Sequence, residues 1–273
     1  PDRPRLTLVA YSPMIQLLII DGLNLLRRIY SALPAQENDT PDIEQFMKAA
    51  ENAVKHLLKQ HQPSHAVCVL EHYQSTWRHQ LYPPYKANRK PQPAAMLQSF
   101  PQLQKSLEAL GISWLDVNGY EADDIIASIV YATAEHHCQN LIISSDRLMA
   151  QLLSQNTALY DHYGHQAISR ESIFKRYAIG PGQLPDYYAL TGSSSVNIPG
   201  IAGIGAKTAT RLLSQYQDCD ALLQADDLDT KTARQLEGQQ TALYLYRGLF
   251  RLRQDCPIHG NLKDWRVKPP SGS

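Results

Sequence analysis

Short apolar runs of strand length alternate with helix-like segments through the first part of this chain, and this alternation limits the folds open to it. Between the runs, apolar residues recur at the spacing of one helix face over 43–57 and 125–130. Strands that alternate with helices favour a parallel sheet covered on both faces, so the sequence predicts an α/β fold. The predicted strands are Ile15–Ile20, Ala66–Leu70, a shorter one at Ile112–Leu115, and Leu141–Ser144.

The pattern changes after about Glu171, where strand-like runs give way to helical periodicity alone. We therefore predict an α/β domain over 14–170 and a helical domain over 171–268. Residues 1–13 carry no secretory pattern, and we expect them to be a disordered extension outside the fold. The helices predicted in the second domain lie near Tyr187, over 206–216 and over 231–252.

The composition suits a folded protein, because 43% of the 273 residues are hydrophobic and 19% are charged. No apolar run is long enough to cross a membrane, so we expect no membrane partner. The cysteines are scattered without a CxxC pair, which argues against a zinc site and favours reduced thiols in a cytoplasmic protein. We expect a cytoplasmic monomer. The cysteines are Cys68, Cys138, Cys219 and Cys256.

The net charge is zero, which by itself argues against a nucleic-acid partner, but the charges are segregated. No Asp or Glu occurs over 72–107 or over 187–217, so the carboxylates gather elsewhere. Basic stretches with separate carboxylate clusters fit a metal-dependent enzyme that acts on a phosphodiester. Chance segregation on a solvated surface is the alternative. The basic residues of the first stretch are Arg78, Lys86, Arg89, Lys90 and Lys105.

Carboxylates stand at or near the carboxyl ends of the predicted strands. In an open α/β sheet these ends share one edge, where ligands bind. Carboxylates brought together there would repel one another unless a cation lay among them, and Mg²⁺ suits oxygen ligands. The alternative is that each acid caps or begins a helix. The acids are Asp21, Glu71 and Asp146 after three of the strands, and Glu121, Asp123 and Asp124 in the segment EADD.

The segment Ile198–Ala209, IPGIAGIGAKTA, combines three glycines with the start of an amphipathic helix. Glycine tolerates positive φ and leaves backbone N–H groups open to close approach by a phosphate. The helix N-terminus adds a partial positive charge and Lys207 adds a full one. The segment therefore suits binding to a nucleic-acid backbone without base reading. A plain connecting turn is the alternative.

A proline-rich, basic segment at 82–93 interrupts the α/β pattern. The apolar residues that follow, from Met96 to Leu107, predict a helix with one buried face. An insertion at this place would bridge the mouth of a site at the sheet edge. An ordinary crossover loop and helix is the alternative.

Together these segments resemble the structure-specific 5′ nucleases, or flap endonucleases, and most closely the stand-alone bacterial Xni-type (exonuclease IX-like) enzymes. The match runs from LLIIDGLN in the first strand through YKANR at Tyr85 and GYEADDIIA at Gly119 to NIPGIAGIGAKTA at Asn197, so it covers nearly the whole chain. The resemblance implies a PIN-like parallel sheet flanked by helices, with a helical arch at about 82–110. It also implies a helical duplex-DNA-binding domain with a helix–three-turn–helix hairpin at 197–209.

The resemblance implies Mg²⁺-dependent hydrolysis of phosphodiesters at 5′ flaps near single-strand to double-strand junctions, as in Okazaki-fragment processing during DNA replication and in DNA repair. It implies two Mg²⁺ ions, one held mainly by water and DNA, and a K⁺ ion held by main-chain carbonyls. Lys86 and Arg89 would stabilise charge on the transferring phosphate. Asp21 would be a third catalytic residue, and Arg78 would contact the DNA backbone.

Matching positions carry the family's binding roles onto this sequence. The metal ligands so implied are Asp21, Glu71, Glu121, Asp123, Asp124 and Asp146. The K⁺ ligands are Leu190, Thr191, Pro199, Ile201 and Ile204. The further DNA contacts are Gly203, Ile204, Gly205, Ala206, Lys207 and Thr208.

The chain departs from the family pattern where the second metal ion would bind. The family segment TADKD appears here as SSDRL, which puts Leu148 in place of its second aspartate. The segment GDxSDNxPG appears as GSSSVNIPG, which puts Ser193 and Val196 in place of two more, and Glu71 replaces another. Xni-type enzymes share this thinned second site. The losses leave open a catalytically impaired DNA-structure-binding protein. A PIN-like RNA nuclease would share the acidic body but not the glycine-rich hairpin.

Overall fold

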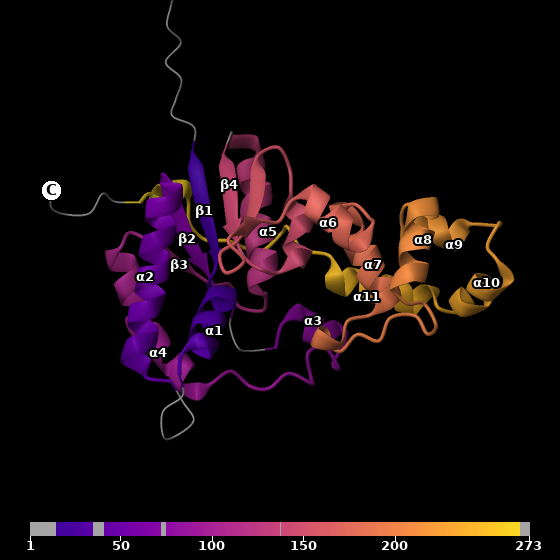
Figure 1. The fold of residues 1–273 in the computed structure, drawn as a ribbon, viewed down its shortest axis with the longest axis horizontal. Coiled ribbons are helices and arrows are strands. Elements are labelled where there is room, and N and C mark those ends of the chain that lie inside the picture. The colour runs from indigo at the N-terminus through magenta and orange to yellow at the C-terminus, as the bar shows by residue number, and fades with distance from the viewer. Residues whose placement is uncertain (1–14, 35–40, 72–74, 137, 268–273) are drawn as a thin grey trace, which may run out of the picture.

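The computed structural model describes residues 15–34, 41–71, 75–136 and 138–267, and the extension predicted over 1–13 lies outside them. The structure has an α/β body with a helical part against one side (Figure 1). The predicted fold class is confirmed: a six-stranded sheet has the order β3-β2-β1-β4-β5-β6, in which β1 to β5 run parallel and β6 runs antiparallel to β5. The strands are β1 (Gln16–Asp21), β2 (His65–Val69), β3 (Ser113–Leu115), β4 (Gln139–Ile143), β5 (Thr157–Asp161) and β6 (Gln166–Ala167).

Strands β1 to β4 lie within two residues of their predicted bounds, whereas β5 and β6 were not predicted. These two strands form the edge of the sheet beyond β4. In β5, buried Thr157 and Leu159 flank exposed Ala158, so the strand lacks the continuous buried run that marks β1 and β2. A strand near the edge of the sheet that is less completely covered leaves a weaker signal in the sequence.

Helices cover both faces of the sheet and divide its core in two. They are α1 (Gly22–Ala32), α2 (Ile43–His61), α4 (Ala94–Ala109) and α5 (Ala122–Thr133), while the short α3 (Trp77–Leu81) packs against the end of the helical part. Along β1, Leu18 and Ile20 enter the core under α1, α2 and α4, whereas Leu17 and Ile19 enter the core shared with α5 and the helical part. Burying each of these side chains stabilises the fold by about 1.5–3 kcal/mol.

The segment predicted as a helical arch, at about 82–110, has two different parts. Residues 82–93 form turns without a helix. Helix α4 packs on α2 and β3 and buries Met96, Leu103 and Leu107. Helix α4 is therefore a crossover helix of the body rather than an arch over the sheet edge, because its apolar face is used in the core.

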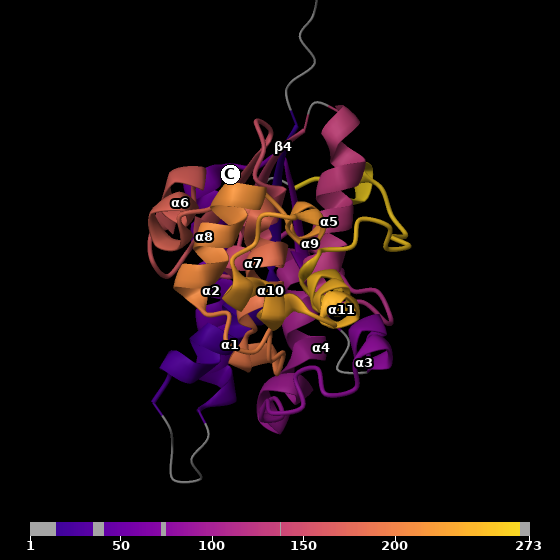
Figure 2. The same ribbon diagram turned by 90° about the vertical axis from the view of Figure 1, so that its right-hand side faces the viewer.

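The helical part contains α6 to α11, and α8 begins and ends at its predicted residues. The single long helix predicted over 231–252 is wrong, because the chain turns at Gly238, whose φ of +69° does not fit a helix. Figure 2, which faces the helical part, shows α11 beside α3 of the body. The helices are α6 (Arg170–Tyr177), α7 (Leu184–Thr191), α8 (Ala206–Tyr216), α9 (Cys219–Gln224), α10 (Thr230–Leu236) and α11 (Gln240–Phe250).

The described residues were predicted to contain no membrane-spanning segment and to keep their cysteines reduced. None of their helices combines the length and apolar character needed to cross a membrane. The four cysteines are unpaired and buried. Burial raises the pKa of Cys68 to about 12, so this thiol stays protonated at neutral pH.

Candidate functional site

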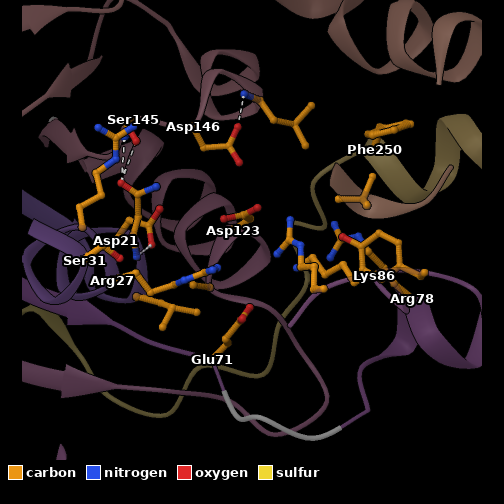
Figure 3. Close-up of a pocket in the computed structure, with 18 of the residues that line it drawn as sticks. Asp21, Arg27, Ser31, Glu71, Arg78, Lys86, Asp123, Ser145, Asp146 and Phe250 are labelled. Atoms are coloured by element: carbon orange, nitrogen blue, oxygen red, sulfur yellow. Dashed lines mark hydrogen bonds between the residues drawn. The ribbon is translucent and has the colours of Figure 1, made fainter. Parts of the chain in front are cut away.

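A cavity of about 650 Å³ opens at the carboxyl ends of β1, β2 and β4 (Figure 3). Predicted carboxylates reach it from the end of β1, from the residues after β2 and β4, and from the first turn of α5. Basic side chains line the same space. The charged lining residues are Asp21, Glu71, Asp123 and Asp146, together with Arg27, Arg28, Arg78, Lys86 and Arg89.

Asp21 is placed by the junction of β1 and α1. It is the last residue of β1 and the N-cap of α1, where its Oδ1 accepts the backbone N–H of Asn24 at 3.2 Å. Its Oδ2 accepts the hydroxyl of Ser144 at 2.7 Å. Burial raises the pKa of Asp21 to about 7 against these two hydrogen bonds, and the charges of Asp146 and Glu71 add to the rise. The carboxylate of Asp21 is thus held by two uncharged donors, while the carboxylates of Asp146 and Glu71 lie near it.

Asp123 and Asp146 approach the cavity from two other elements. Asp146 precedes the 3₁₀ helix Arg147–Leu152, and its Oδ1 accepts the N–H of Leu148 at 2.8 Å. Asp123 lies in the first turn of α5 and points into the cavity (Figure 3). Burial raises the pKa of Asp123 well above its ordinary range, and the charges of Asp146 and Asp21 raise it further. Like charges held together in this way favour a bound cation.

These carboxylates fit a hydrated Mg²⁺ better than an ion enclosed by protein. Within the described residues, no three Asp, Glu, His or Cys side chains converge closely enough to hold a metal by themselves. Mg²⁺ keeps several waters and takes one or two carboxylates plus substrate phosphates, so it suits an open acidic site. Helix capping is compatible with this role, because the cap uses Oδ1 of Asp146 and leaves Oδ2 for a ligand.

The second aspartate of the EADD segment has a different environment. Asp124 is fully buried, and its two oxygens accept N–H groups from both ends of the Arg78 guanidinium, at 2.6 and 2.8 Å. Trp77 Nε1 and the backbone N–H of Arg253 also donate to it, each at 2.9 Å. Both oxygens of Asp124 are thus occupied by donors of the protein, and Arg78, which pairs with it, is 1% exposed. The metal role of Asp124 and the DNA contact of Arg78 stay predictions that this pairing does not favour.

Glu121 belongs to the same buried network rather than to the cavity lining. Burial alone would raise its pKa, but Lys86 and Arg78 outweigh burial, so the pKa is lowered. Arg78 also donates to the backbone carbonyl of Leu249 at 2.8 Å, which joins the α/β body to the end of α11. The Glu121 carboxylate is thus paired within the protein, and its metal role stays a prediction. Its carboxylate accepts from Lys86 Nζ at 2.6 Å, from the Tyr85 hydroxyl at 3.0 Å and from Arg78 Nη1 at 3.1 Å.

Lys86 and Arg89 reach the cavity from the segment 82–93. The ammonium group of Lys86 pairs with Glu121, while exposed Arg89 donates its Nε to the backbone carbonyl of Ser195 at 2.8 Å. Glu71 faces the same space, and burial raises its pKa against the opposing charge of Lys86. The two predicted catalytic cations and the predicted acids Asp21, Glu71, Asp123 and Asp146 therefore line one cavity.

Two exposed arginines of the cavity were not predicted. Arg27 and Arg28 lie on α1, and the guanidinium of Arg28 lies over the ring of Tyr163, 5.1 Å from its centroid. Their signal in the sequence is a basic pair about two turns into the helix that Asp21 caps. Leu148 and Val196, which stand where the resembled family has aspartates, also line the cavity.

The glycine-rich segment forms the turn that leads into α8. Gly203 has a φ of +81°, and Gly205 is the N-cap of a helix without an acidic residue in its first turn. The partial positive charge at the N-terminus of α8 is therefore not offset by a carboxylate in the first turn. Ile204 is buried, so its side chain is not available to a ligand. The turn is exposed at Gly203, Gly205, Ala206 and Lys207, and partly exposed at Thr208.

The carbonyl positions predicted for K⁺ lie where the end of α7 meets this turn. Ile201 N–H donates to the carbonyl of Leu190 at 2.8 Å. A Cβ on Gly200 would lie 2.3 Å from the backbone nitrogen of Gly192, so the two segments touch in a way that only glycine allows. The contact brings together the backbones of Leu190, Thr191, Pro199 and Ile201, with Ile204 following in the same turn.

Two family models match the chain in succession. The one described as 5′-3′ exonuclease, N-terminal resolvase-like domain, matches residues 16–178, and the one described as 5′-3′ exonuclease, C-terminal SAM fold, matches residues 179–273. Flap endonuclease Xni of Psychromonas ingrahamii is 39% identical over 252 residues, which cover 92% of this chain and 96% of that protein. The chain belongs to the flap endonuclease Xni family.

Flap endonuclease Xni of Photobacterium profundum is 37% identical to this Xni-family chain over 259 residues, 94% of this chain and 99% of that protein. Among solved structures, zinc-bound T5 5′-exonuclease has a TM-score of 0.75 at 19% identity, covering 86% of this chain and 89% of that one. The catalytic core of Rad2 with DNA substrate has a TM-score of 0.56 at 13% identity, covering 88% and 80%. These two likenesses concern the fold.

Proposed function

We propose that this chain is a Mg²⁺-dependent flap endonuclease, which hydrolyses a phosphodiester where a 5′ single strand leaves a duplex. The observation that carries the proposal is a single cavity lined by Asp21, Asp123 and Asp146 and by Lys86 and Arg89. Clustered carboxylates beside fixed cations suit a metal-assisted reaction at a phosphate. Membership of the Xni family supports the same activity, since the relatives are named flap endonucleases.

Three carboxylates of the cavity are the residues that would hold Mg²⁺: Asp123, Asp21 and Asp146, with Glu71 lining the same cavity. Mg²⁺, when bound, supplies positive charge at the phosphate and lowers the pKa of water. Leu148 and Val196 offer no ligand atoms at the cavity wall. A second ion would therefore depend on water and on the phosphates of the DNA.

The cations of the cavity wall are anchored before a substrate arrives. Arg89 uses Nε to bind Ser195, so its Nη groups are the ones that would meet a phosphate, and Lys86 is held by Glu121. Fixed charges of this kind stabilise the transition state without reorganising during the reaction. In the reaction a water oxygen bonds to phosphorus while the P–O bond of the strand breaks, which leaves a phosphate on one end and a hydroxyl on the other.

The turn 203–208 is the proposed contact with the duplex backbone, through its exposed amides and Lys207. K⁺ held by the carbonyls around Gly192 and Gly200 would reinforce this turn, which the family resemblance supports. Lys207→Ala should weaken duplex binding to a similar extent for all sequences and reduce the salt slope by about one. An unchanged affinity would remove Lys207 from the interface.

Cleavage of a labelled 5′-flap duplex with Mg²⁺ and K⁺ tests the proposed function. We expect cutting near the junction that is lost in Asp123→Asn and kept in Asp226→Asn, which removes the same charge from an exposed residue between α9 and α10. Tight binding of the flap without cleavage, equal in wild type and Asp123→Asn, would contradict the proposal. The chain would then be a DNA-structure-binding protein.

A further inference from the structure

The loop 193–197, which follows α7, contacts the segment that carries Lys86 and Arg89. Three consecutive carbonyls of the loop each accept one donor from that segment, and a side chain of the loop donates back to it. The bonds are Asn88 Nδ2 to Ser194 O (2.6 Å), Arg89 Nε to Ser195 O (2.8 Å), Lys86 N to Val196 O (2.9 Å) and Asn197 Nδ2 to Pro84 O (2.8 Å).

The backbone on both sides of this contact adopts an uncommon conformation. Lys86 has a φ of +55° and Asn197 a φ of +57°, values that are rare outside glycine and tolerated best by asparagine and aspartate. Such conformations persist where the surroundings fix them. Beneath the hydrogen bonds, Tyr85 of one segment and Ile198 beside the other are buried in one apolar cluster with Phe250. The two segments therefore form one packed unit.

The loop also lies at the cavity. Val196 lines it, as do Lys86 and Arg89 from the facing segment. Ser193 and Val196 are positions where the resembled family has aspartates, so the side chains of the loop bring no carboxylate, while its main-chain carbonyls accept from the facing segment. Those carbonyls fix the backbone of Lys86 and the guanidinium of Arg89.

We propose that loop 193–197 is a brace that positions Lys86 and Arg89 for the reaction, with Asn88 and Asn197 as its positioning residues. The proposal rests on the proposed function of the cavity. The chain continues from the brace into the glycine-rich turn before α8. The cavity cations and the proposed duplex contact are thus carried by one continuous support, which fixes their relative position.

Single-turnover cleavage of the 5′-flap duplex tests the brace in Asn88→Ala and Asn197→Gly. Glycine tolerates the positive φ at 197 while removing the side chain that donates to Pro84, so a loss would not come from backbone strain. We expect cleavage about tenfold slower in each variant, because small misplacement of catalytic groups is costly, with duplex affinity within about twofold of wild type. Ser194→Ala is the matched control: it removes a neighbouring hydroxyl and keeps the carbonyl. A cleavage rate equal to wild type in both asparagine variants would overturn the proposal.

A double-mutant cycle separates positioning from general destabilisation. In an Arg89→Met background, adding Asn88→Ala should slow cleavage by about threefold or less, since part of what the brace positions is already absent. The same tenfold loss in both backgrounds would show that Asn88 acts independently of Arg89, against the proposal.

Amide hydrogen exchange of residues 82–93 in the DNA-free protein gives a measurement that needs no catalysis. We expect faster exchange in Asn88→Ala and Asn197→Gly than in wild type and Ser194→Ala, with the Lys86 amide most affected. Unchanged exchange would contradict the brace. If wild-type protein left the flap intact, the proposed function would fail, while this measurement would still decide whether the loop holds the segment.

Discussion

Asp123 and Asp124 are neighbours in the chain but belong to two different electrostatic environments. Asp123 faces a cavity that it shares with Asp21 and Asp146, and burial together with these like charges raises its pKa. Asp124 faces the interior, where Arg78 meets both of its oxygens. One carboxylate is thus available to an external cation, and the next is neutralised by a cation of the protein itself.

Helix geometry explains how adjacent residues come to differ so much. Successive side chains on α5 point about 100° apart, whereas residues three apart share a face. Glu121 is the N-cap of α5 and Asp124 lies in its first turn, and both bind Arg78, while Asp123 points into the cavity. A run of acids does not define a metal site by itself, because the cations brought to each face decide which acids remain open.

Removing the internal cation should have the largest effect. Arg78→Met leaves Asp124 without a counter-charge in the interior and removes one of the two cations that pair with Glu121. We therefore expect the free energy of unfolding to fall by about 3–5 kcal/mol. Urea denaturation measures the loss. Arg27→Met, at an exposed site, should change stability by less than about 0.5 kcal/mol. Equal stabilities of the two variants would show that the buried pair is not a structural element.

The two aspartates should separate in activity. Asp123→Asn should slow flap cleavage by about 10³-fold, which corresponds to about 4 kcal/mol, without loss of folded protein. Asp124→Asn should lower stability, while the folded fraction cleaves within about threefold of wild type. Cleavage rates normalised to the folded fraction from circular dichroism test this contrast. Loss of cleavage in fully folded Asp124→Asn protein would contradict the predicted difference between the two aspartates.

Mg²⁺ should stabilise the protein through the cavity and not through the buried network. At ten times the dissociation constant we expect a gain of about 1.4 kcal/mol, seen as a rise in melting temperature. Asp123→Asn should reduce this gain, and Asp226→Asn should preserve it. A gain of the same size in Asp123→Asn would place the ion elsewhere.

Adding acids to the cavity should have the smallest effect. Leu148→Asp with Val196→Asp would supply ligand atoms where the wall is apolar, and we expect cleavage to become about fivefold faster by stronger binding of a second ion. The Mg²⁺ dependence of the cleavage rate should shift to lower concentration. An unchanged rate would mean that an ion held by water and DNA already suffices.

Most of the α/β body could be predicted, because β1 and β2 contain continuous buried apolar runs and β4 ends in the apolar run Leu141–Ile143. Asp21 and Asp146 could be assigned to the cavity because they follow strands that share one sheet edge. The pairing of Arg78 with Asp124 could not be predicted, since 46 residues separate them and no local pattern links the two. The same holds for the contact between residues 84–89 and loop 193–197.

The sequence by itself determined the local elements: the parallel strands, the start of α8 after Gly205, and the carboxylates at the strand ends. These features depend on periodicity, turn residues and chain order, which are all properties of neighbouring residues. The tertiary structure decided which carboxylates stay open, where Arg78 lies, and what supports Lys86 and Arg89. The physical reason is that desolvation and Coulomb interactions depend on distances in space, which the chain sets only when distant segments pack together.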